Sequence, residues 1–86
     1  MLHETATAPA MTLDLIGLKC PLPVLHTRKA LAAITAGSML DVRTSDPLAV
    51  IDIPHLLATT GDTLVALHQD AGVARFLIRK CGPSGK

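Results

Sequence analysis

Hydrophobic and polar residues alternate over four segments of the chain, which predicts four strands. The first two segments are 12–17 and 38–44, and the last two are 63–69 and 73–80. The short sequence Asp70-Ala71-Gly72 separates the last two, so we expect them to form an antiparallel hairpin.

The segment from Pro21 to Ala36 has the spacing of a helix instead. Val24, Leu31 and Ile34 recur at helical intervals and predict its buried face. Proline is favoured at the first helical position, and Gly37 suits the helix end.

A second helix is predicted to begin at Asp46-Pro47, a capping carboxylate followed by proline, and to continue to about Thr60. Val50, Ile53 and Leu57 give its apolar face. Because proline disturbs a helix interior, Pro54 predicts an interruption, with Asp52 as a new cap.

The element order is therefore βαβαββ. A strand-helix-strand unit makes its two strands parallel, and the final hairpin adds an antiparallel pair. The sheet is thus mixed, and two helices cover one face of it. The predicted fold class is an α+β two-layer sandwich.

Length and composition agree with one small domain. The 86 residues suffice for one core, which we place at 12–81, between flexible tails at 1–11 and 82–86. The net charge is only +1 and the chain has no Trp or Tyr, which argues against direct nucleic-acid binding. No apolar run is long enough to span a membrane and no secretion signal is visible, so the expected location is the cytoplasm.

Cys20 is the candidate reactive residue. It immediately precedes Pro21 and the predicted helix, whose unpaired amides and partial positive charge stabilise a thiolate. With Lys19 as a neighbouring cation, we expect the pKa of this thiol to lie below its ordinary value. Pro21 and Pro23 stiffen the first turn, and Gly17 permits a tight turn before it. No obvious general base accompanies Cys20, which favours a carrier that exchanges sulfur with partner proteins.

Alternative roles remain open for the two cysteines. Cys20 could be a buried packing residue in a non-catalytic interaction module. Cys81 could pair with Cys20 in a thiol–disulfide oxidoreductase, provided that the two lie close together. His26 could tune Cys20. The four histidines lack the close spacing of metal ligands, so no metal site is predicted.

The sequence Gly17-Leu18-Lys19-Cys20-Pro21-Leu22-Pro23 resembles the Gly-Leu-x-Cys-Pro-x-Pro signature of the TusA/SirA-like sulfur carriers. Further matches follow in order between Leu13 and Lys80: Gly37, Asp46-Pro47, Asp52-Ile53-Pro54 and Leu77-Ile78-Arg79-Lys80. The extension before Thr12 and the second cysteine, Cys81, depart from the family pattern.

The resemblance implies a four-stranded sheet and a sulfur-relay function without a cofactor. The cysteine matched by Cys20 accepts sulfur as a persulfide from a cysteine desulfurase or a rhodanese-like donor. It passes the sulfur to an acceptor protein in tRNA thiolation, molybdenum-cofactor assembly or sulfur oxidation.

Four residues are candidates for docking such partners: Asp52, Pro54, Arg79 and Lys80. Three of them have a simpler role as well. Asp52 suits a helix cap, as does Asp46, and the two basic residues suit a solvated surface.

Overall fold

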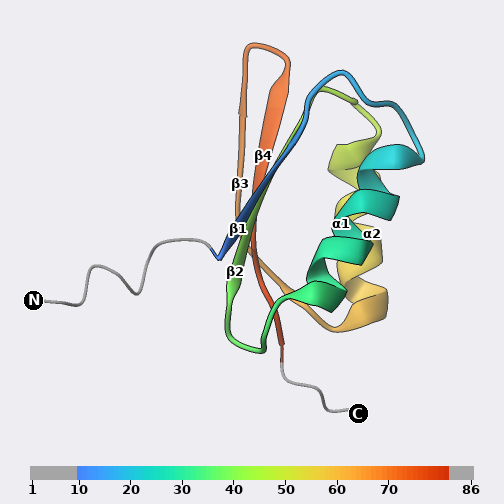
Figure 1. Ribbon diagram of the computed structural model, residues 1–86. Coiled ribbons are helices and arrows are strands. Elements are labelled where there is room, and N and C mark those ends of the chain that lie inside the picture. The colour runs from blue at the N-terminus through green and yellow to red at the C-terminus, as the bar shows by residue number, and fades with distance from the viewer. Residues whose placement is uncertain (1–9, 82–86) are drawn as a thin grey trace, which may run out of the picture.

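A computed structural model describes residues 10–81, and it contains two helices and a four-stranded sheet in the predicted order (Figure 1). The elements are β1 (Met11–Leu15), α1 (Leu22–Ala33), β2 (Met39–Thr44), α2 (Ala49–Thr60), β3 (Thr63–Asp70) and β4 (Val73–Arg79). Both helices lie on one face of the sheet, which confirms the two-layer α+β sandwich. Neither of these helices has the length and apolar character to span a bilayer.

The topology places the amino ends of both helices at one end of the molecule. The strand order is β1-β2-β4-β3, with β1 parallel to β2 and β4 antiparallel to both β2 and β3. Strands β1, β2 and β3 therefore run in the same direction, and each helix returns the chain to the start of the next. As a result, α1 and α2 run side by side in the same direction and begin at the carboxyl ends of β1 and β2 (Figure 1).

The predicted boundaries of β1 and α1 differ from the structure. Strand β1 already includes Met11, which pairs with Leu40, because Met11 continues the apolar alternation into the residues we had assigned to the tail. Helix α1 ends at Ala33, and Gly37 instead occupies a left-handed position in the turn before β2. The rest of the predicted tails, 1–9 and 82–86, lies outside the described residues.

Helix α2 is continuous, so the predicted restart at Asp52 is wrong. Pro54 lies inside the helix, and the missing amide removes only one backbone hydrogen bond. Ile53 and Leu57 on either side of it are buried against the sheet. Tertiary packing of this apolar face supplies most of the helix stability, which explains why the proline is tolerated.

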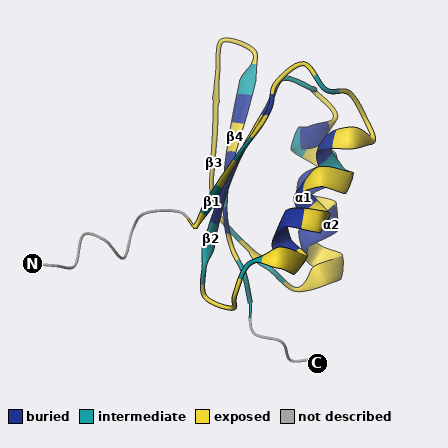
Figure 2. Ribbon diagram, viewed as in Figure 1, coloured by how far each residue is buried: buried dark blue, intermediate teal, exposed yellow. Residues whose placement is uncertain are grey.

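The core fills the space between the helices and the two central strands, as Figure 2 shows by the dark blue segments. Alternate residues of β2 and β4 point into it, and Phe76 of β4 is fully buried. The apolar core consists of Leu15, Ala30, Leu31, Leu40, Val42, Ala49, Ile53, Leu57, Ala74, Phe76 and Ile78. Of the predicted face of α1, Leu31 is buried, whereas Val24 and Ile34 are only partly covered.

Thr27 occupies a core position that the apolar pattern did not reveal. Its side chain is fully buried on the sheet side of α1, and its hydroxyl is the one buried side-chain polar atom within residues 10–81 that lacks a hydrogen-bond partner. A buried hydroxyl without a partner lowers stability, because it has lost its hydrogen bonds to water.

We therefore expect Thr27→Val to keep or increase the free energy of unfolding, by up to about 1 kcal/mol. Urea unfolding followed by circular dichroism measures this change. Thr27→Ala is the control: it also removes the hydroxyl but leaves a void, and should lower the free energy of unfolding. A clear loss of stability in Thr27→Val would show that the hydroxyl has a partner.

Asp41 is a buried carboxylate on the face of the sheet that the helices do not cover. It is 2% exposed, and Arg75 binds it through Nε at 3.0 and 3.1 Å and through Nη2 at 2.9 Å. The guanidinium is about half exposed, and the hydrogen bond to Asp41 is the main cause that raises its pKa. This two-pronged contact compensates the desolvation of Asp41.

Removing the guanidinium should destabilise the fold, because it leaves a buried carboxylate without its partner. For Arg75→Met we expect a lower free energy of unfolding, with a smaller loss than for a fully buried pair, since Arg75 itself is solvated. Thermal or urea unfolding measures the loss. Arg43→Met is the matched control, on the same face and exposed; equal losses in the two variants would contradict the assignment.

Candidate functional site around Cys20

Cys20 lies in the loop that leads from β1 to α1. The chain turns at Gly17, whose φ of +92° is unfavourable for residues with a side chain, and whose amide donates to Ser45 Oγ at 2.8 Å. The amide of Leu22 then donates to the Lys19 carbonyl at 2.8 Å, which starts the helical turn. The thiol therefore stands at the amino end of α1 and is exposed.

Asp46 fixes this loop to the start of α2. One oxygen, Oδ2, accepts the amide of Cys20 at 2.8 Å, and the other, Oδ1, accepts the amide of Leu48 at 3.1 Å. The predicted cap at Asp46 is therefore wrong, because the N-cap of α2 is Leu48 and has no side-chain cap; Asp46 instead forms the turn before the helix and holds Cys20 from 26 residues away.

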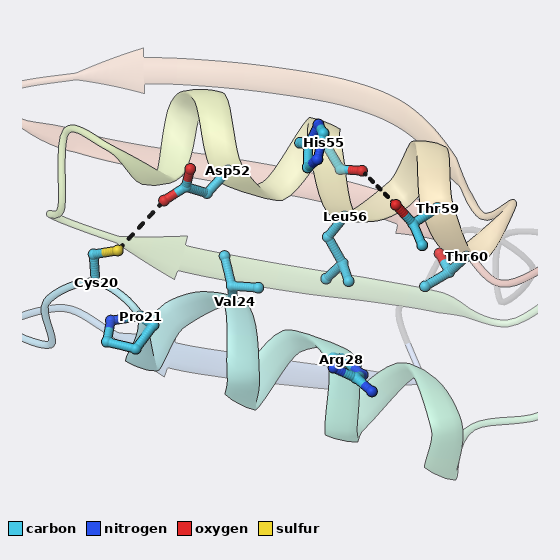
Figure 3. A pocket seen from close by; sticks show the side chains of 9 residues that line it. All are labelled: Cys20, Pro21, Val24, Arg28, Asp52, His55, Leu56, Thr59 and Thr60. Carbon is cyan, nitrogen blue, oxygen red and sulfur yellow. Dashed lines mark hydrogen bonds between the residues drawn. The ribbon is translucent and has the colours of Figure 1, made fainter.

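Asp52 is the nearest side chain to act on the thiol. Its Oδ2 lies 3.6 Å from Cys20 Sγ, a distance at which the thiol donates a hydrogen bond to the carboxylate (Figure 3). Partial desolvation raises the pKa of Cys20, and the hydrogen bond and negative charge of Asp52, with the charge of Asp46, raise it further.

Two expectations about Cys20 are therefore wrong. The pKa of the thiol is raised where we expected it to fall, because desolvation and then the hydrogen bond and charge of Asp52, with the charge of Asp46, all raise it. A proton-accepting group, the carboxylate of Asp52, is also present beside the Cys20 thiol. Sequence could not reveal this contact, because the two residues are 32 positions apart and meet only when α1 and α2 pack.

A groove runs from Cys20 along the line between the two helices. It has a volume of about 550 Å³. Its lining residues come from the two helices and the loop before α1: Cys20, Pro21, Val24, Arg28, Asp52, His55, Leu56, Thr59 and Thr60 (Figure 3). Thiol and carboxylate lie at one end, and apolar side chains and two basic residues lie further along.

Sequence reasoning did not assign Arg28 or His55 to the site. The signal that could have found them is helical spacing. Asp52, His55 and Thr59 lie three and four residues apart on α2, and Val24 and Arg28 lie four apart on α1, so each set shares one helix face. His26, the histidine that we considered as a tuning group, is exposed and does not line this groove.

The other predicted support residues have separate positions. Pro21 is the N-cap of α1 and lines the groove, whereas Pro23 is buried and anchors the first turn in the core. Lys19 is exposed beside Gly17, on the loop side of Cys20. Pro54 is partly buried within α2, next to the core residue Ile53.

Arg79 and Lys80 lie at the opposite end of the sheet from Cys20. The amide of Lys80 donates to the Ser38 carbonyl, before the start of β2, whereas Cys20 contacts Asp46 beyond the end of β2. Six extended residues span about 20 Å. The ammonium of Lys80 donates to the Leu31 carbonyl at 2.7 Å, so it anchors the end of α1.

Cys81 also lies at this far end, where its amide donates to Asp62 and its sulfur lies 3.5 Å from Thr63 Oγ1. Both cysteines are free thiols. A disulfide needs Cα atoms within about 7 Å, so Cys20 and Cys81 of one folded chain cannot pair. This separation removes the oxidoreductase alternative. No group of three or more metal-binding side chains forms within residues 10–81.

Comparisons with known proteins agree with this fold and place the chain in a family. The family model described as "Sulfurtransferase TusA" matches residues 11–80. The chain is 40% identical over 68 residues to the sulfur carrier protein TusA of Allochromatium vinosum, covering 79% of this chain and 90% of that protein. Among solved structures, the SirA-like protein of Desulfitobacterium hafniense is similar with a TM-score of 0.73 and 28% identity, over 83% of this chain and 97% of the other. The chain therefore belongs to the TusA sulfurtransferase family.

Proposed function

We propose that the protein is a sulfur-relay carrier in which Cys20 accepts sulfane sulfur as a persulfide and delivers it to an acceptor protein. The observation that carries this proposal is the exposed thiol at the amino end of α1, at one end of the groove between the helices. The relative from Allochromatium vinosum, described as a sulfur carrier protein, supports the same role.

The proposed loading step is a thiol exchange without net oxidation. The Cys20 thiolate attacks the terminal sulfur of a donor persulfide, the sulfur–sulfur bond of the donor breaks, and the donor leaves as a thiolate that takes up a proton. One sulfur atom moves from donor to Cys20. Unloading is the same reaction with Cys20 as the donor, so neither step needs a cofactor.

The partners we propose are a cysteine desulfurase or a rhodanese-like protein as donor and a separate protein as acceptor. Acceptors in tRNA thiolation, molybdenum-cofactor assembly and sulfur oxidation fit the same exchange chemistry. We propose the cytoplasm as the location, since thiols there stay reduced and available for sulfur exchange.

A non-catalytic interaction module is the second candidate. The observation in its favour is a set of large aliphatic side chains that are exposed near Cys20, among them Leu48 and Ile51. In that case partner binding and cellular function would not need the thiol. Replacement of Cys20 by serine separates the two candidates.

Incubation with a persulfide donor should add about 32 Da, the mass of one sulfur atom, to the chain, and a reductant should remove it. Intact-mass spectrometry measures the gain, and peptide mapping should place it on Cys20. Cys20→Ser should gain nothing, whereas the matched control Cys81→Ser should gain as much as the unmodified chain. Sulfur that persists on Cys20→Ser would overturn the proposal.

The raised pKa of Cys20 predicts the pH dependence of its reactivity in the free chain. Only the thiolate reacts, so alkylation by iodoacetamide should accelerate as pH rises, with a midpoint above about 8.5, the ordinary value for cysteine. The thiol also stabilises the fold in its protonated form, a contribution that is lost as pH rises through the pKa of the folded state.

This profile is best measured on Cys81→Ser, which leaves a single thiol. The same chain unfolded in urea is the control, since unfolding separates Cys20 from Asp52 and should return the midpoint to the ordinary value. A folded-state midpoint below that of the unfolded chain would contradict the assigned electrostatics.

A further inference from the structure

The position of Asp52 has a consequence for how the carrier is controlled. Its carboxylate accepts the thiol hydrogen of Cys20, so loss of that proton breaks a hydrogen bond and leaves two negative charges 3.6 Å apart. Both atoms belong to side chains that water reaches, since Cys20 is exposed and Asp52 is partly exposed. A visiting protein can therefore reach this pair.

The two carboxylates beside Cys20 differ in what else they bind. Asp46 accepts backbone amides with both oxygens, from Cys20 and from Leu48, so its position is fixed by the fold. Within residues 10–81 the side chain of Asp52 has the thiol as its hydrogen-bond partner. The remaining acceptor positions of Asp52 are open to a donor from outside.

Within residues 10–81, the basic side chains near the site do not neutralise the charge of Asp52. Arg28 of α1 and His55 of α2 line the same groove, and Lys19 precedes Cys20. None of these three makes an ion pair with Asp52 in the described part of the chain. The causes that act on the Cys20 pKa all raise it, which agrees with an unneutralised carboxylate.

Large hydrophobic residues are exposed at the same end of the molecule as this pair. Seven large hydrophobic residues are exposed among residues 10–81, and five of them belong to the ends of β1, α1 and α2 that surround Cys20. We call these five the aliphatic rim: Ile16, Leu22, Leu25, Leu48 and Ile51, which are 43–67% exposed. Exposed large apolar side chains at one end of a domain are typical of protein interaction sites.

We propose that Asp52 is a positioning residue that holds the Cys20 thiol inactive in the free chain, and that a partner activates the thiol by placing a lysine or arginine side chain on this carboxylate. The partner surface that fits is apolar where it meets the aliphatic rim and carries this cation beside its own reactive sulfur. The inference rests on the proposed sulfur-carrier function.

This activation by a partner would affect both the loading of sulfur onto Cys20 and its unloading. In loading, the cation takes the Asp52 carboxylate, the thiol proton passes to solvent, and the thiolate attacks the donor sulfur. In unloading, Cys20 is the leaving group, and a thiol of lower pKa leaves faster. Sulfur would therefore stay on the free carrier and move only within a complex.

The pH profile of Cys20 alkylation tests the positioning role. Measured on the Cys81→Ser chain, Asp52→Asn should shift the midpoint to lower pH and accelerate alkylation near neutral pH by about threefold to tenfold. Asp52→Glu should restore most of the raised midpoint, because it keeps the charge. Asp70→Asn is the matched control, since it removes one exposed carboxylate from the end of β3, and should change neither value.

Two thiol reagents of opposite charge test the kind of partner. Aminoethyl and sulfonatoethyl methanethiosulfonate react with the same thiolate, so the ratio of their rates reports the local charge and cancels the effect of the thiol pKa. The unmodified site should prefer the cationic reagent, and Asp52→Asn should reduce this preference by about threefold to tenfold at low salt.

An unchanged pH profile and an unchanged rate ratio in Asp52→Asn would overturn this inference, as would a preference of the unmodified site for the anionic reagent. Neither result bears on sulfur loading itself, which the mass gain on Cys20 decides separately. A chain that gains sulfur normally but shows no effect of Asp52 would refute the control mechanism alone.

Discussion

The contact between Cys20 and Asp52 is the interaction on which the functional site depends. It exists because α1 and α2 run in the same direction and begin at the same end of the sheet, so that the residue before one helix meets the first turn of the other. That arrangement follows from the position of β4 between β2 and β3, which makes three of the four strands parallel. Asp46 completes it by binding the backbone of Cys20.

This arrangement reverses the simple expectation for a thiol at a helix start. The partial positive charge of a helix end favours a thiolate, whereas desolvation and the carboxylates of Asp52 and Asp46 all raise the pKa of this thiol. The result is a thiol that is accessible yet mostly protonated near neutral pH. For a protein that hands a labile sulfur between enzymes, low reactivity outside the complex limits exchange with other thiols. The loop before α1 thus makes the Cys20 thiol accessible, whereas Asp52 of α2 lowers its reactivity.

The sequence predicted the elements well because their signals are local. Alternation identified the strands, and Asp46-Pro47 placed the start of α2 within three residues of its observed start at Ala49. The site was less predictable, because its decisive contacts join residues that are 26 and 32 positions apart. Asp52 was recognised only as a cap or docking residue, and Thr27 was missed as a core residue because a hydroxyl carries no apolar signal. Lys80 was considered for docking, whereas its ammonium is bound to the Leu31 carbonyl of α1, 49 positions away in the sequence.

The most direct test of this account is the ionisation of Cys20 itself, without any reagent. The chain contains no Trp or Tyr, so the ultraviolet absorbance of a thiolate can be followed with little background in the Cys81→Ser protein. The account predicts a folded-state pKa above about 8.5, the ordinary value of a cysteine thiol. A thiolate that is already formed well below that pH would contradict it.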